Sequence, residues 1–224
     1  MKKYMIFCMV TLLMSSCSKQ IVTRIAQYPK MYEEKPLTIA VMPPINQTQH
    51  VEAKDYFYTT LYAPLCEKGY YVYSPMMTME MFQSESAYDA EQFIESDLSQ
   101  FRNVLGADAA MFTIIKSWKR STVGGMLTAG VEYILRSTKT GETLYKREGL
   151  ISVDTRIHAG GGAFGALAGL IATAVNTAAT DKVVAGRKCT VFVLSDMPEG
   201  KYGTKYDQDQ EFPAGKSYIK ATVK

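Results

Sequence analysis

The pattern of apolar and polar residues predicts alternating strands and helices in the first half of the chain. Apolar runs at 37–42 and 70–74 each end at proline, as expected of buried strands followed by loops. Residues 53–68 between them are predicted to form a helix. One face of it carries four apolar side chains at helical spacing: Tyr58, Leu61, Tyr62 and Leu65. Pro64 is expected to kink or shorten this helix, because proline lacks the N–H that a helix needs.

Two helices and a three-stranded unit are predicted next. Residues 76–83 and 96–105 are expected to be helical, and 109–116 to be a strand. Segments 126–138 and 143–155 alternate in polarity and are separated by a glycine-containing turn, which predicts a β-hairpin.

The last third of the chain is less regular. Residues 159–180 are small and apolar and are predicted to be helical, and 181–187 continues this helix or forms a short second one. The run TVFVLS at 190–195 is predicted to be a last core strand. From 199 to 224 we expect a loosely ordered polar tail with one edge strand at 218–223.

This order of elements predicts an α/β fold, with one mixed sheet and helices packed on it. The first half is expected to be of the parallel type, and the hairpin makes the second half antiparallel. Residues 36–198 have the length of a single domain, which the polar tail 199–224 follows.

The first eighteen residues have the order of a secretory signal peptide. Lys2 and Lys3 precede an uncharged apolar run of about eleven residues, which is too short to span a bilayer. Two serines then precede Cys17. We therefore predict a signal peptide at 1–16.

The cysteine that follows the small pair resembles the lipobox of bacterial lipoproteins, in which cleavage leaves a lipid-modified cysteine at the mature N-terminus. This resemblance implies lipidation of Cys17 and a lipidated tether at 17–35. Met14 departs from the leucine usual at its position. Ser18 favours the outer membrane, because aspartate there would suggest retention in the inner membrane. The alternatives are a signal peptide without lipidation and an uncleaved membrane anchor.

The formal charge of +3 overstates the charge of the mature protein. Removal of Lys2 and Lys3 leaves 23 basic side chains (25 less 2) against 22 acidic ones. The chain has no stripe of Lys and Arg, which argues against nucleic acid as a partner.

Residues that could carry chemistry are sparse. Cys66 and Cys189 would reside in an oxidising compartment, where they form a disulfide or remain two buried apolar side chains. His50 and His158 have no companions at metal-ligand spacing. The carboxylates Glu91, Glu95 and Asp97 are expected on a solvated face. We predict no catalytic residue, metal site or cofactor.

The glycine-rich segment fits G-x-G-x-x-G at 160–165, but the strand before it belongs to a hairpin and does not open a parallel βαβ unit, so we reject nucleotide binding. Gly161, Gly165 and Gly169 are spaced by four and would line one face of a helix. This face is expected to pack within the domain, to mediate contact with a partner or another copy, or to enter a membrane.

Tyrosines gather in the predicted helix and strand between residues 53 and 74. Tyrosine is enriched at interfaces, yet alternate tyrosines in YYVYS must point to opposite faces. The cluster therefore predicts either an interface or core packing for six side chains: Tyr56, Tyr58, Tyr62, Tyr70, Tyr71 and Tyr73.

Several segments together resemble a family of bacterial lipoproteins of unknown function, whose genes accompany a lipoprotein like the pore-forming component of curli secretion. The matching features are the Cys17 signal, LTIAVMPPIN at 37–46, A-D-A-A from Ala107, STKTGETLY at 137–145 and the Gly/Ala-rich segment after Ala159. The resemblance implies a periplasm-facing fold like the amino-terminal domain of the Tol translocation protein and the lipoprotein activators of penicillin-binding proteins. Those are interaction modules.

The leading hypothesis is a non-enzymatic lipoprotein of the outer membrane, anchored through Cys17, that binds envelope proteins in a secretion or export assembly. By the resemblance, a curli-secretion-type lipoprotein is a candidate partner, and a homo-oligomer is a further expectation. The first alternative is a membrane-active oligomer that uses helix 160–180. The second is a small-ligand binder or envelope hydrolase.

Overall fold

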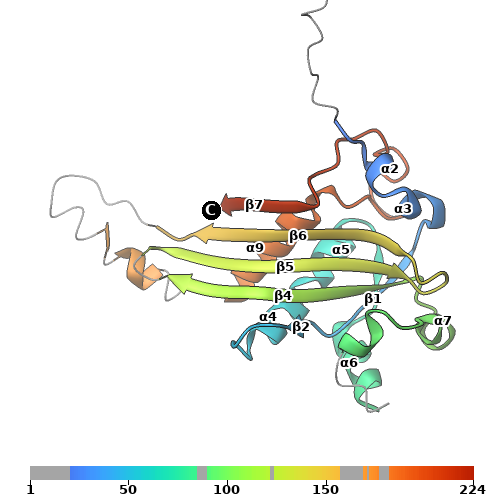
Figure 1. Ribbon diagram of the computed structural model, residues 1–224, viewed down its shortest axis with the longest axis horizontal. Coiled ribbons are helices and arrows are strands. Elements are labelled where there is room, and N and C mark those ends of the chain that lie inside the picture. Colours follow the sequence, from blue (N-terminus) through green and yellow to red (C-terminus); the bar gives the residue numbers. More distant parts are fainter. Residues whose placement is uncertain (1–20, 85–89, 122–123, 157–168, 171, 177–181) are drawn as a thin grey trace, which may run out of the picture.

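The structure is a computed structural model, which describes residues 21–84, 90–121, 124–156, 169–170, 172–176 and 182–224. Within these residues, seven strands form one sheet in the order β3-β1-β4-β5-β6-β7, and β2 pairs with β4 off this path (Figure 1). Helices pack around the sheet, so the predicted mixed α/β fold is confirmed.

The first half of the chain supplies the parallel strands. β1 (Thr38–Val41) lies between β3 (Tyr71–Val72) and β4 (Ala109–Ser121) and runs parallel to both. The short strand β2 (Ile45–Asn46), which the sequence did not indicate, is also parallel to β4. The parallel character predicted for this half is confirmed.

The second half is built on three long antiparallel strands. β4 pairs with β5 (Met126–Ser137), and β5 pairs with β6 (Thr143–Asp154). The predicted hairpin joins β5 to β6. Gly141 in its turn has a φ of 73°, which glycine adopts without strain. The predicted edge strand is β7 (Tyr218–Val223), which lies parallel to β6.

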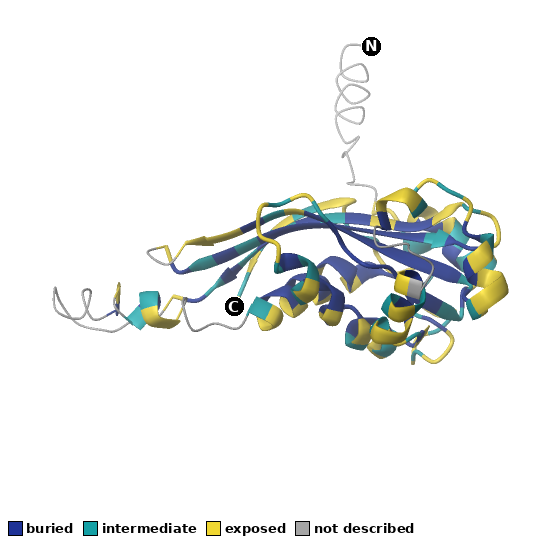
Figure 2. Ribbon diagram, turned by 90° about the horizontal axis from the view of Figure 1, so that it is seen from below, coloured by how far each residue is buried: buried dark blue, intermediate teal, exposed yellow. Residues whose placement is uncertain are grey.

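A helical layer packs along one face of the sheet (Figure 2). It consists of α4 (Ala53–Thr60), α5 (Tyr62–Glu67) and α9 (Lys182–Val193). The break between α4 and α5 at Leu61 confirms the interruption expected near Pro64. Leu61 and Leu65 are fully buried in the core beneath this layer.

A smaller group of helices covers part of the sheet elsewhere: α6 (Pro75–Ser84), the 3₁₀ helix η1 (Ala90–Phe93) and α7 (Ser99–Leu105). Phe82 and Phe101 pack with Phe112 of β4 in a second apolar cluster. The two helices predicted at 76–83 and 96–105 are thus present, the second three residues shorter than expected.

The strand predicted at 190–195 is wrong. Its residues continue α9 and then form the 3₁₀ helix η2 (Leu194–Asp196). A short apolar run does not distinguish a strand from a buried helix. Here Ala185, Cys189 and Val193 recur every four residues and are buried against the sheet, so packing favours the helix.

The expected tether is wrong over residues 21–35. This segment forms α2 (Arg24–Gln27) and α3 (Pro29–Glu34), and Tyr28 and Met31 are buried in the main core. The polar residues after 199 are also ordered by packing. Asp209 is fully buried and accepts hydrogen bonds from Arg24 Nη1 (2.7 Å) and Tyr32 Oη (3.1 Å).

One buried carboxylate joins four segments of the chain. Asp196 forms an ion pair with Arg147 of β6, Nη1 to Oδ1, at 2.5 Å. It also accepts hydrogen bonds from Tyr145 Oη (3.0 Å), from Tyr28 Oη (2.8 Å) and from the backbone N–H of Gly215 (2.7 Å). Burial, followed by the hydrogen bond to Asp196, raises the pKa of Tyr28, so its phenol remains a donor. We call these five residues the Asp196 cluster.

The substitution Asp196→Asn should lower the free energy of unfolding by about 3–5 kcal/mol, because it leaves the buried Arg147 charge without its counter-ion. Urea denaturation measures the effect. The matched control is Asp207→Asn, which removes the surface ion pair with Lys35. It should change the free energy of unfolding by less than about 1 kcal/mol. Equal losses in the two variants would contradict the role of the cluster.

Candidate functional site

One histidine and the acidic residues of the 91–97 stretch lie at the surface. His50 is exposed, and so are Glu91, Glu95 and Asp97. In the part of the chain that the structure describes, no group of three His, Cys, Asp or Glu side chains is placed to hold a metal ion. His158 lies outside the described residues.

A polar depression lies between α3, α7 and the β5–β6 turn. Most of its charged side chains are paired with one another. Lys30 contacts Glu33 (3.1 Å) and Glu142 (3.0 Å), and Arg102 contacts Asp108 (3.4 Å). A charged ligand would have to displace these pairs, so the depression provides no argument for a ligand site.

The middle of the long strands carries a charged ladder. Lys116 Nζ lies between Glu132 (2.8 Å) and Glu148 (2.7 Å), and Lys146 contacts Glu132 at 3.0 Å. Burial raises the pKa of Glu132, but hydrogen bonds from the two lysines outweigh it and hold the pKa below its ordinary value. This surface is neutralised internally and suits contact with solvent.

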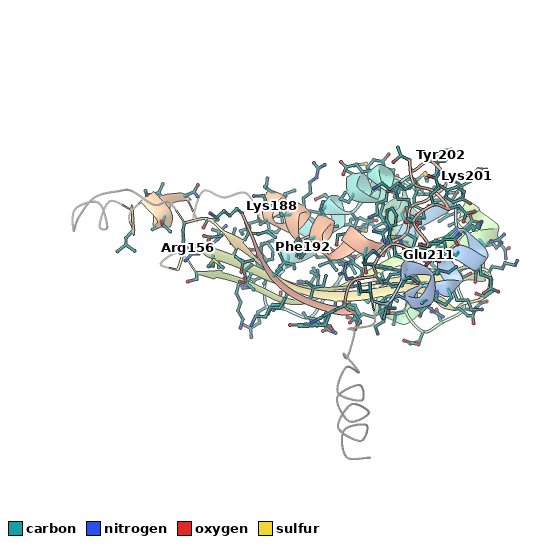
Figure 3. All side chains as sticks on the ribbon, turned by 90° about the horizontal axis from the view of Figure 1, so that it is seen from above. Arg156, Lys188, Phe192, Lys201, Tyr202 and Glu211 are labelled. Carbon is teal, nitrogen blue, oxygen red and sulfur yellow. The ribbon has the colours of Figure 1, made fainter. Side chains whose placement is uncertain are left out.

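The outer side of α9 has a different character. Its exposed residues are four apolar side chains, with exposed fractions from 36% to 48%, and two basic ones, of which Arg187 is paired with Glu67 at 3.0 Å. We call the four apolar side chains and the remaining lysine the α9 strip: Val183, Val184, Lys188, Val191 and Phe192. Figure 3 shows Lys188 and Phe192 on this helix. An outer helix face usually carries polar residues, so the α9 strip is a candidate interaction surface.

The opposite side of α9 fixes the helix on the sheet. Thr190 Oγ1 is hydrogen-bonded to Tyr133 Oη (2.8 Å) and to Thr60 Oγ1 (3.1 Å). Gly149 of β6 lies directly under Val193, and a Cβ at this glycine would overlap the valine Cγ2. The α9 strip is therefore presented by a rigid element.

The tyrosine cluster divides between core and surface. Tyr58 and Tyr70 are buried, whereas Tyr62 and Tyr71 are 45% and 55% exposed. Tyr71 and Tyr73 make an edge-to-face ring contact with centroids 5.6 Å apart. The exposed tyrosines lie on α5 and β3, so they form a second apolar surface at the β3 edge of the sheet.

Most of the glycine-rich segment, including Gly161 and Gly165, lies outside the described residues. Gly169 is helical and buried, and 172–176 is helical. Asn176 Nδ2 donates to the Thr155 carbonyl at 2.8 Å, which places this piece at the end of β6. Among the described helices, none has the length and apolar character needed to cross a membrane.

The two cysteines are free thiols in the structure, so the arrangement is the unbridged alternative. Cys66 is half-buried in α5. Cys189 is fully buried in α9, and not at the start of a strand as predicted. Burial strongly raises the pKa of the Cys189 thiol, which makes it a poor nucleophile.

Under denaturing, non-reducing conditions, a maleimide should label both Cys66 and Cys189, as counted by mass spectrometry. In the folded protein Cys66 should react faster, because Cys189 is buried and protonated. The variant Cys66→Ser controls the assignment. A denatured, unreduced chain that takes up no label at these two positions would show that a disulfide had formed.

The α9 strip and the Asp196 cluster were both missed in the sequence. The strip comprises two apolar doublets, at 183–184 and 191–192, which share one helix face only when 182–193 is helical throughout. Because 190–195 was assigned to a strand, this shared face was hidden. No local pattern marks Asp196.

The family model described as "Putative lipoprotein GNA1162-like" matches residues 26–199. A curated relative from Neisseria meningitidis serogroup B, named "Putative lipoprotein NMB1124/NMB1162", is 23% identical over 157 residues, which cover 69% of this chain and 73% of the relative. The crystal structure of lipoprotein GNA1162 from N. meningitidis matches with a TM-score of 0.48 and 22% identity, over 65% of this chain and 100% of that one. A PelC dodecamer from Paraburkholderia phytofirmans matches with a TM-score of 0.38 and 13% identity, over 72% and 87% of the two chains.

Proposed function

This chain belongs to the GNA1162-like lipoprotein family, and on that premise we propose that it is a non-enzymatic envelope lipoprotein that docks another envelope protein. Its signal peptide ends at residue 16, and lipid on Cys17 anchors the domain to the outer membrane, facing the periplasm. The family match and the basic, apolar, small order of residues 1–17 support the anchor.

The observation that carries the docking role is the α9 strip. Interfaces bury apolar and aromatic side chains at their centre, and the strip offers Val184, Val191 and Phe192 on one rigid helix. Lys188 is exposed among them. The partner that fits is an envelope protein with an apolar centre and a carboxylate opposite Lys188.

The partner we favour is a component of a secretion or export assembly, such as a curli-secretion-type lipoprotein. This choice rests on the resemblance of segments such as 37–46 and 137–145 to the lipoprotein family. A second copy of this chain is the competing occupant of the α9 strip.

The anchor is tested by replacing Cys17. Wild-type cells should incorporate labelled palmitate into the protein, and the protein should remain in the membrane fraction. Each methylene of an acyl chain that is buried in the bilayer contributes about 0.8 kcal/mol to membrane binding. The variant Cys17→Ala should lose both properties. Labelled palmitate that persists in Cys17→Ala would contradict lipidation at this residue.

Docking is tested with a photo-cross-linking residue at Val184 in intact cells. It should give one discrete cross-linked product, and Val191→Asp should reduce that product on the order of tenfold, because it places a charged group where the interface needs an apolar side chain. Two matched controls use Val104 of α7, which is 70% exposed: one places the probe at this position, and the other combines Val104→Asp with the probe at Val184.

Equal cross-linking from Val184 and Val104, or a product that Val191→Asp leaves unchanged, would contradict docking through the α9 strip. The mass of the product separates a second copy of this chain from a different protein.

A further inference from the structure

The start of the described chain is held by the C-terminal segment. Val22 accepts a hydrogen bond from the N–H of Ala214 at 2.8 Å, and the N–H of Arg24 donates to the Phe212 carbonyl at 2.8 Å. An antiparallel bridge pairs Thr23 with Pro213. The chain is therefore fixed to the folded body at residue 22, thirteen residues before the end of the tether that the sequence predicts.

This early start limits how far the domain can lie from its anchor. Four residue steps separate Cys17 from Ile21, and an extended chain of that length spans at most about 14 Å. A tether from Cys17 to Lys35 would have reached about 60 Å. The polar headgroup layer of a leaflet is itself about 5–8 Å thick. Lipid on Cys17 would thus keep this end of the domain close to the headgroups.

The surface at this end has the chemistry of a membrane interface. Ile21 and Val22 are 69% and 47% exposed, and Phe212 beside them is 38% exposed. The ammonium of Lys205 lies over the Phe212 ring, 5.3 Å from its centroid. Aliphatic and aromatic side chains with an adjacent lysine suit the boundary between acyl chains and anionic headgroups. We call this set, Ile21, Val22, Lys205 and Phe212, the anchor-side surface.

We infer that the anchor-side surface lies on the bilayer, with Phe212 and Ile21 at the headgroup level and Lys205 facing anionic lipid. The contact gives the domain one orientation relative to the membrane. It rests on the proposed lipidation of Cys17, because the lipid is what brings this surface to the bilayer.

The test compares two phenylalanines of nearly equal exposure. Phe212 is 38% exposed on the anchor-side surface, and Phe192 is 36% exposed on the outer side of α9. The variants Phe212→Trp and Phe192→Trp are purified from membranes as full-length lipoproteins. They are reconstituted into vesicles of phosphatidylethanolamine and phosphatidylglycerol that contain a phospholipid with a nitroxide headgroup. The native Trp118 is buried and gives both variants the same background.

The nitroxide lipid should quench the tryptophan fluorescence that Phe212→Trp adds, and the fluorescence that Phe192→Trp adds should persist. A long Gly/Ser linker inserted between Gln20 and Ile21 should weaken the quenching of Phe212→Trp, because it removes the length limit. Equal quenching of the two tryptophans, or none at position 212, would overturn the inference.

Flotation of the same vesicles separates this inference from the proposed function. A protein that floats with the vesicles but shows no quenching at position 212 retains its anchor, and only the membrane contact fails. A protein that does not float lacks the lipid, so the proposed anchoring fails and the membrane contact fails with it.

Discussion

The buried Asp196 carboxylate is the interaction on which the arrangement of the chain ends depends. A buried charge is costly unless its lone pairs are satisfied. Here the Arg147 guanidinium, two tyrosine hydroxyls and the N–H of Gly215 satisfy them. Because these donors come from the N-terminal helices, β6 and the C-terminal segment, the charge cannot be accommodated unless all of these segments are in place.

Arg147 extends this constraint to the edge of the sheet. Its guanidinium also donates to the carbonyl groups of Val193 (2.9 Å) and Lys216 (3.0 Å), just before β7. Parallel strands need a long connection between them, and residues 199–217 supply part of it by packing against α2 and α3. Asp209 fixes this connection through Arg24 and Tyr32. The two buried carboxylates thus explain why a polar tail is ordered.

Local patterning was sufficient for every strand except β2 and for helices α4 to α7, because alternation and helical spacing report which face of an element is buried. It failed where order comes from pairs distant in sequence. Tyr28 and Asp196 are 168 positions apart, and Arg24 and Asp209 are 185 apart, so no local window predicts either contact. It also failed at 190–195, where a short apolar run suggested a strand. That error concealed the α9 strip, since exposure on α9 is apparent only once 182–193 is one helix.

The magnitudes explain why the anchor and the α9 strip would act together. Full burial of an aliphatic or aromatic side chain is worth about 1.5–3 kcal/mol. Because the four apolar side chains of the strip are already more than half buried, the remaining gain is roughly 2–5 kcal/mol in total. Association from free solution costs an estimated 4–15 kcal/mol in lost motion. The strip alone is therefore too weak for stable binding in solution. Confinement at a membrane converts encounter into a nearly intramolecular event, which raises avidity by about 10²–10⁴. A short anchor that also fixed orientation would lower the cost further, because the rigid α9 would then meet a membrane-bound partner in one geometry.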